Sequence, residues 1–390
     1  MTGAIIITLC ILLLLSYVFD ITASKTKLPS VILLLVLGLV MRKAVDTLSI
    51  SMPNLAPVLP LLGTIGLILI VLEGSLELEF NKSKFPLIAK SSLLALLSIV
   101  VLTISFATAF FYFTHLPFRS CLINALPLSI ISSAIAIPTS RNFSAENREF
   151  IVYESSLSDI FGVILFNFII YNDSLGINAV GHFFIQIVLI AFLSFIVTVG
   201  LLLLLRKLNH HVRYTPIILL IILVYAVSKE LHLPALLFIL VLGLFFANFE
   251  KLAHFNAIQK LHPDVLKIEI KRFKELTVEM TFLIRSLFFL LFGFMIETSK
   301  LFDLGSFLWS LGIIVAIYGS RWVLLKIFKL SIQPLLFIVP RGLITILLFL
   351  SIPTEHAVFI VNDSLVIQVI IFTALLMMFG MFGVKRSMSV

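Results

Sequence analysis

Charged residues are scarce in this sequence, and their scarcity excludes a soluble globular protein. Asp, Glu, Lys and Arg make up 12% of its 390 residues, whereas soluble domains carry about 25%. Hydrophobic residues make up 61% of the chain. We therefore expect an all-α polytopic membrane protein with almost no mass outside the bilayer.

Cysteines and catalytic motifs are also few. The two cysteines, Cys10 and Cys121, lie in or beside apolar runs and suggest neither a disulfide framework nor a metal site. Nothing resembles a nucleophile, phosphate or metal motif, so an enzyme has little support and no cofactor is expected. No Lys or Arg precedes Lys25, which favours a retained first span over a cleaved signal peptide.

The basic residues indicate a membrane topology. The formal net charge is +8, but the charges lie in short loops, so topology explains them better than a nucleic-acid partner. With the N-terminus outside, inside loops hold 20 Lys and Arg residues and outside loops hold 5. This bias puts the C-terminus in the cytoplasm, as an odd number of spans requires. About thirteen apolar runs approach the length that crosses a ~30 Å core, beginning near Ala4, Leu28, Pro57, Leu87, Leu122, Ile151, Phe183, Pro216, Pro234, Met280, Leu304, Pro334 and Leu365.

Two acids, Glu154 and Asp159, lie on the sixth apolar run. A carboxylate at bilayer depth costs roughly 2.5–3.5 kcal/mol on insertion scales and by default indicates an ion or proton site. The two acids are five residues apart, so on an ideal helix they point about 140° from each other. One acid can therefore pair with an arginine while the other faces a wet site.

Two proline-interrupted spans suggest an inverted repeat with two crossed broken helices. Pro138 and Thr139 lie in the fifth run, and Pro340 and Gly342 lie in the twelfth. The two runs are seven spans apart, and an odd offset inverts their orientation in the membrane. Proline frees a backbone carbonyl one turn back, and paired broken helices at matching positions indicate a transporter site.

These features define a predicted ion-binding site. We expect Asp159 to be the transport acid and Glu154 to form a structural ion pair with Arg341, which lies beside the second break. Ser155 and Ser158 share helix faces with the two acids and complete the predicted ion and proton site on this span. The secondary candidates are the remaining charges in or beside the apolar spans, Glu73, Arg285 and Arg321.

Four motifs resemble the monovalent cation/proton antiporter superfamily, in particular its NhaP-like sodium/proton antiporter branch. The segment Glu154–Asp159 is similar to that branch's Glu-Ser, two variable residues, Asn, Asp. Leu72–Leu78, Gly319–Arg321 and Pro340–Leu343 resemble its third-span, eleventh-span and Arg-Gly elements. The resemblance covers most of the chain.

The sequence departs from the branch at two positions. Ser158 stands where the branch has asparagine, and Ala136-Ile137-Pro138 stands where it has Thr-Asp-Pro. By the resemblance, Ala136 is counted with the ion-binding residues, while Ile137 removes an acid from the first break. Serine still donates and accepts hydrogen bonds.

The resemblance implies the fold of the NhaA and NapA antiporters, in a homodimer in the inner membrane. Residues 1–80 and 215–300 would form a dimerisation scaffold. Residues 84–172 and 304–386 would form the ion-translocating core, and residues 180–207 would be a linker helix. Transport would be an elevator-like movement of the core against the scaffold.

The expected function is exchange of a monovalent cation, Na⁺ before Li⁺ or K⁺, for H⁺. Asp159 can hold a proton or a cation but not both, and this competition couples the two gradients. Because Ser158 is neutral, we expect one cation per proton and electroneutral exchange. Two alternatives remain open: a membrane sensor or effector that kept the antiporter fold, and a channel-like K⁺ efflux protein.

Overall fold

The computed structural model contains helices and connecting segments, and no strand, in the residues it describes. These are residues 2–26, 30–48, 57–78, 84–140, 143–172, 214–230, 235–249, 263–296 and 303–382, with residues 181, 185, 188–190, 192–197 and 200. The helices are α1 (Thr2–Thr26), α2 (Ser30–Thr47), α3 (Val58–Glu77), α4 (Phe85–Thr114), α5 (Phe118–Ser129), α6 (Ser133–Thr139), α7 (Ala145–Tyr171), α9 (Tyr214–Glu230), α10 (Ala235–Ala247), α13 (Pro263–Met295), α15 (Leu304–Ile327), α16 (Leu343–Leu350), the 3-10 helix η3 (Thr354–His356) and α17 (Asp363–Phe382).

Seven helical segments within these ranges are long and apolar enough to cross a membrane. They confirm an all-helical, multi-pass membrane protein, whereas the count of thirteen spans stays a prediction. The predicted linker helix, residues 180–207, lies largely outside the described residues. The seven segments are Val58–Glu77, Phe85–Thr114, Phe118–Thr139, Ala145–Tyr171, Lys267–Met295, Leu304–Ile327 and Asp363–Met381.

The chain forms two compact units. The first contains residues 1–64, 87–162 and 283–390, and the second contains residues 65–86 and 163–282. Since α3, α7 and α13 have residues in both units, the units are not separate stretches of the chain. The predicted division into scaffold and core follows different boundaries and stays a prediction.

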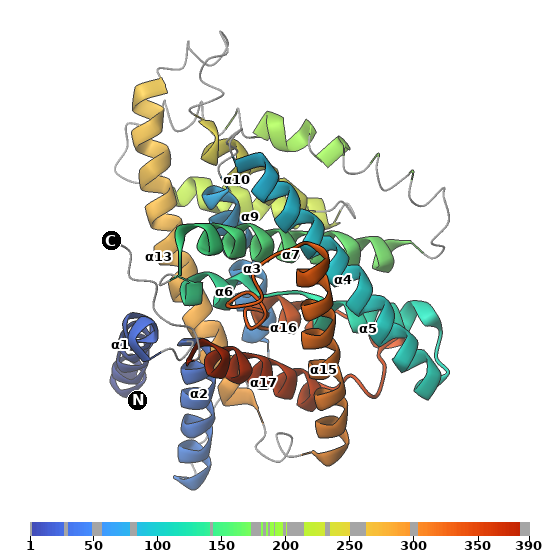
Figure 1. Cartoon of the computed structure of the whole chain (residues 1–390). Coiled ribbons are helices and arrows are strands. Elements are labelled where there is room, and N and C mark those ends of the chain that lie inside the picture. The colour runs from blue at the N-terminus through green and yellow to red at the C-terminus, as the bar shows by residue number, and fades with distance from the viewer. Residues whose placement is uncertain are drawn as a thin grey trace. The chain divides into compact units, whose positions relative to one another are not determined.

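The first unit contains both proline-interrupted segments. Within it α15 packs against α17, and α16 packs against α5 (Figure 1). Asp303 begins α15, because its side chain accepts a hydrogen bond from the Ser306 N–H at 2.9 Å, which satisfies one of the free donors of the first turn. This start places Arg321 in the buried part of α15.

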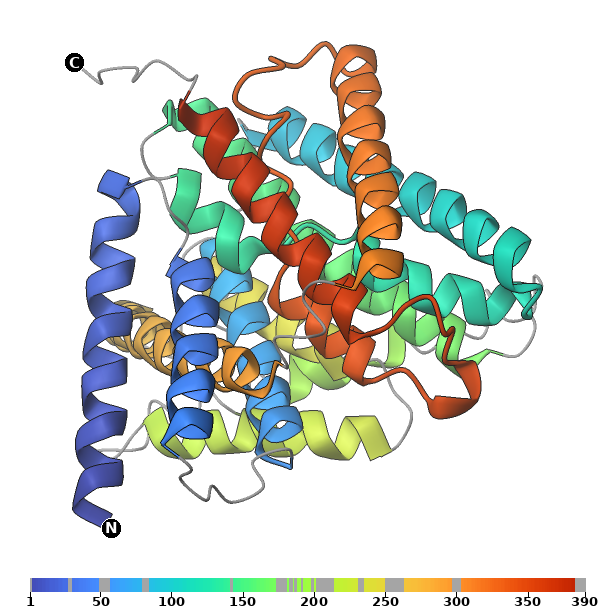
Figure 2. The ribbon, with the colours of Figure 1, turned by 90° about the horizontal axis from the view of Figure 1, so that it is seen from below.

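Glycines set a close helix crossing in the same unit. α1 and α2 lie side by side (Figures 1 and 2), and α2 crosses the end of α13 at Gly38 and Gly293. A Cβ atom on Gly38 would lie 2.7 Å from the Phe294 nitrogen, and one on Gly293 would lie 2.9 Å from the Leu35 Cα. Backbone therefore contacts backbone, as small residues allow between membrane helices.

The second unit is held by an apolar core with a few polar contacts. Phe238, Leu242 and Phe273 are buried in it. The Asn248 amide donates to the Leu78 carbonyl at 3.0 Å, which ties the segment after α10 to the end of α3. A buried amide in an apolar setting needs such a partner.

Candidate functional site

The first break separates α5 from α6 at residues 130–132. Ile130 and Ser132 have extended backbone conformations. Pro127 lies before the break, inside α5, and Pro138 lies after it, inside α6. Three consecutive backbone N–H groups are therefore free to bind other elements. Ile131 N–H donates to Ser158 Oγ at 3.0 Å, Ser132 N–H to the Pro340 carbonyl at 2.9 Å, and Ser133 N–H to Asp159 Oδ2 at 3.2 Å.

The second break precedes α16 and meets the first one. Residues 338–342 are not helical, and Pro340 supplies the carbonyl that Ser132 binds. Gly342 has φ −169°, an extended conformation open to any residue, so glycine is needed here for space. A Cβ atom would lie 2.6 Å from Ser132 Oγ and 2.9 Å from Ile135 Cδ1.

Asp159 is anchored at one carboxylate oxygen and free at the other. Its Oδ2 accepts from both the N–H and the hydroxyl of Ser133. Its Oδ1 is buried and has no hydrogen-bond partner among the described residues. The residue is only 3% exposed. A carboxylate oriented by two donors, with one oxygen left over, is suited to hold a proton or a small cation.

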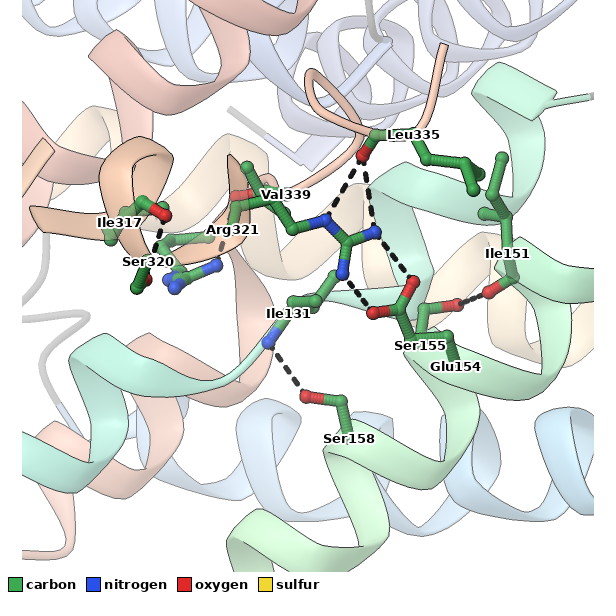
Figure 3. A network of polar contacts seen from close by, with 11 residues as sticks. Ile131, Ile151, Glu154, Ser155, Ser158, Ile317, Ser320, Arg321, Leu335 and Val339 are labelled. Carbon is green, nitrogen blue, oxygen red and sulfur yellow. Dashed lines mark hydrogen bonds and ion pairs between the residues drawn. The ribbon is translucent and has the colours of Figure 1, made fainter. Parts of the chain in front are cut away.

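Glu154 faces a different part of the first unit, as its helical position predicts. Its Oε2 accepts from Arg321 Nη2 at 2.8 Å, and its Oε1 accepts from Arg321 Nη1 (Figure 3). Arg321 also donates to the Leu335 carbonyl from Nε at 3.2 Å and from Nη2 at 3.1 Å. Both charged side chains are buried, and a two-pronged arginine–carboxylate pair is the arrangement that offsets such burial.

This geometry corrects the predicted ion pair between Glu154 and Arg341. The carboxylate pairs with Arg321, a secondary candidate, because α15 brings that guanidinium to the correct face of α7. The guanidinium of Arg341 instead donates hydrogen bonds to backbone carbonyls: its Nε donates to Leu128 O at 2.7 Å and its Nη1 to Val339 O at 2.9 Å. Leu128 lies in the last turn of α5, where carbonyls lack helical partners and favour a cation.

The remaining predicted residues near the first break lie as follows. Ser155 donates to the Ile151 carbonyl of its own helix at 2.7 Å (Figure 3). Thr139, next to Pro138 in α6, donates to Ile135 O at 2.7 Å. Ala136 donates its N–H to Ser132 O at 3.0 Å and accepts at its carbonyl from Ser140 N–H. The structure therefore brings Ser133, rather than Ala136, to Asp159.

The two other secondary candidates belong to other helices. Glu73 is half-buried in α3 and belongs to the second unit. Arg285 of α13 places Nη2 3.9 Å from Oδ1 of Asp20, in α1. The sequence reasoning missed Asp20, although an acid inside the first apolar run was a sufficient signal.

Ser133, which donates two hydrogen bonds to Asp159, is a second residue that the sequence reasoning missed. The signal was present, because three serines, Ser129, Ser132 and Ser133, lie between Pro127 and Pro138 in a largely apolar run. Nothing in the sequence said which serine would reach the carboxylate, since that depends on where the helix breaks. Among the described residues, no group of three or more His, Cys, Asp or Glu side chains could hold a resident metal ion.

Comparisons with known proteins agree with this architecture. Residues 9–384 match the family model described as sodium/hydrogen exchanger, transmembrane. A structure of the sodium proton antiporter MjNhaP1 from Methanocaldococcus jannaschii at pH 8 is similar with a TM-score of 0.70 and 19% identity, over 98% of this chain and 99% of that one. An electron-microscopy structure of the same antiporter gives 0.66 and 18%, over 98% and 95%. No curated protein matches.

Proposed function

Because the chain belongs to the sodium/hydrogen exchanger family, in which cations and protons are exchanged across membranes, we propose that it exchanges Na⁺ for H⁺ with Asp159 as the carrier. The observation that supports this role is the carboxylate with one anchored oxygen and one buried, unpartnered oxygen. Li⁺ and K⁺ are the other candidate cations. The proposed location is the cytoplasmic membrane, with the N-terminus outside and the C-terminus inside.

Competition at Asp159 provides the coupling. A cation that binds the carboxylate displaces its proton, and a proton that binds displaces the cation, so each gradient drives the other. An empty, ionised site is costly to carry past an apolar barrier, whereas the protonated or cation-loaded site is neutral. With Ser158 bound to the break in place of a second acid, one cation moves per proton and exchange is electroneutral.

Two buried arginines hold the parts around the carrier. Arg321 links α15, Glu154 and Leu335, and Arg341 links the second break to the last turn of α5. Neither guanidinium contacts Asp159 in these interactions, so both act as positioning residues. If the Asp159 carboxylate oxygen is displaced, it no longer has the geometry that binds the ion, because such sites depend on accurate placement of their groups.

The proposed moving parts follow the predicted assignment. Residues 84–172 and 304–386 form the translocating core, residues 1–80 and 215–300 form the scaffold of a homodimer, and residues 180–207 link them. An elevator-like movement of the core carries the loaded site between the two sides. The bilayer is the protein's second partner, and the many exposed apolar side chains of α1, α4 and α15 suit contact with lipid.

Reconstitution tests this proposal directly. In proteoliposomes that hold a pH-sensitive dye, adding Na⁺ outside should drive H⁺ movement in the parent protein and none in Asp159→Asn. If the Na⁺-driven H⁺ flux is equal at zero membrane voltage and at an imposed voltage, exchange is electroneutral. Cation-dependent proton flux in Asp159→Asn would remove Asp159 from its role, and K⁺ movement without H⁺ movement would favour a K⁺ efflux protein.

A further inference from the structure

Two serine hydroxyls, one in the first break and one on α7, are buried without a partner among the described residues. Ser132 is 2% exposed and Ser156 is 3% exposed, and neither Oγ has a hydrogen-bond partner among the described residues. Asp159 Oδ1 shares this condition. Buried polar atoms are normally bonded, so oxygens left open in one region indicate a ligand that the protein receives there.

The two hydroxyls belong to the two elements that carry Asp159 and its hydrogen-bond donor. Ser156 precedes Asp159 by three positions on α7, which puts the two side chains on one face, about 60° apart. Ser132 is the chain neighbour of Ser133, whose N–H and hydroxyl hold Asp159 Oδ2. The first break and α7 thus each carry one hydroxyl without a partner in the described part of the chain, on a residue one position from Ser133 and three positions from Asp159, respectively.

Neighbouring serines behave differently. Ser129, Ser140 and Ser155 donate to Ala125 O at 3.1 Å, Ile137 O at 2.8 Å and Ile151 O at 2.7 Å, respectively. A helical serine commonly forms such a bond to the preceding turn. Ser132 lies in the break and has no such turn before it, and Ser156 lacks that bond although it is helical. Their open state is therefore a property of these two positions.

The second break keeps Ser132 in place. Gly342 lies so close that a Cβ atom there would be 2.6 Å from Ser132 Oγ and 3.0 Å from its Cβ. The Ser132 N–H is held at the same time by Pro340 O at 2.9 Å. The Ser132 backbone is thus held by the second break, and a group on a held backbone loses less freedom when a ligand binds.

We propose that Ser132 Oγ and Ser156 Oγ are direct ligands of the transported monovalent cation, together with Asp159 Oδ1. The inference rests on the proposed exchange function and deepens it. Hydroxyl oxygens suit a hard cation and add no charge, so a single carboxylate and a single ion leave the loaded site neutral. All three donors are oxygen atoms, which suit hard cations such as Na⁺ and Li⁺.

Direct cation binding tests the inference apart from transport. We would measure binding of ²²Na⁺ to the purified parent, to Ser132→Ala and Ser156→Ala, and to the control Ser129→Ala, whose buried hydroxyl is bonded within α5. Each of the first two variants should bind Na⁺ roughly tenfold more weakly or worse, and the control should match the parent. Unchanged binding in either variant, or an equal loss in all three, overturns the proposal.

Cysteine variants allow a second measurement, the preference for Na⁺ over Tl⁺, which would not change if the two serines had only a structural role. Ser132→Cys and Ser156→Cys keep the side-chain size but replace a hard oxygen by a soft sulfur. Na⁺ binding should fall while binding of the softer ion Tl⁺ is retained. A parallel fall for both ions contradicts direct ligation. A parent protein that neither binds nor exchanges a cation would overturn the exchange function itself. If the parent does both and the serine variants bind the cation equally well, only the ligand assignment is overturned.

Discussion

Two crossings in the first unit are built on opposite principles. Where the breaks meet, consecutive N–H groups of residues 131–133 bind a serine, a carbonyl and a carboxylate, and some oxygens stay open. Where α2 crosses the end of α13, Gly38 and Gly293 bring backbone against backbone. The first crossing depends on polar partners and leaves buried oxygen atoms without one within the described ranges, whereas the second depends on the absence of side chains.

The comparison shows which kind of substitution each crossing tolerates. At the breaks, a change of size matters less than the loss of a partner, since an unpaired buried charge or N–H is costly. At the glycine crossing, any added atom meets backbone, which cannot rotate away as a side chain can. The predictions below are arranged to separate these two sensitivities.

The largest expected effect is the loss of the ion pair that supports the breaks. Glu154→Gln leaves the buried Arg321 guanidinium without its carboxylate, and breaking a buried pair in this way costs about 3–5 kcal/mol. Unfolding titrations in mixed micelles measure the change. The double variant Glu154→Gln/Arg321→Gln should recover part of the loss, because it removes the uncompensated charge. Equal stability of Glu154→Gln and the parent would refute the pair.

The glycine crossing should respond to size alone. Gly293→Ala places a methyl group against the backbone of Leu35, and overpacking of this kind costs about 1–3 kcal/mol. The matched control is Gly312→Ala in α15, where an added Cβ atom has nothing within 4 Å. That control should be neutral or stabilised by up to about 1 kcal/mol, because alanine favours helix. The same unfolding titration distinguishes the two, and a similar response in both variants contradicts the close crossing.

A smaller loss is expected at the hydrogen bond between α7 and the first break. Ser158→Ala removes the acceptor for the buried Ile131 N–H, and an unmet buried donor costs about 1–3 kcal/mol. Ser158→Thr keeps a hydroxyl and should retain most of the stability. In thermal unfolding of the detergent-solubilised protein, dimer or monomer, the melting temperature should fall in the order parent, Ser158→Thr, Ser158→Ala. Identical melting of parent and Ala would show that the break does not depend on Ser158.

Much of the site could be predicted from the sequence, and the reason for each success or failure is physical. The helical period alone separated Glu154 from Asp159, and prolines in two apolar runs marked both breaks, with serines near the first and Gly342 beside the second. Which arginine meets Glu154 could not be predicted, because Arg321 and Arg341 carry the same group and their separation depends on packing between spans. Ser133 was missed because the break lies between the prolines, and the backbone N–H groups it frees determine the contacts.

The smallest expected effect lies at the polar contact between α1 and α13. Asp20→Asn weakens the ionic contact to Arg285, at 3.9 Å between Oδ1 and Nη2, and partly exposed pairs of this kind contribute about 0–1 kcal/mol. The contact lies on the same helix as the glycine crossing, near Ser286, whose hydroxyl accepts from Ser16 at 2.6 Å. Asp20→Asn should therefore melt close to the parent, and the double variant Asp20→Asn/Gly293→Ala should lose little more than Gly293→Ala alone. A loss as large as that of Glu154→Gln would show instead that this region, like the breaks, depends on buried charge.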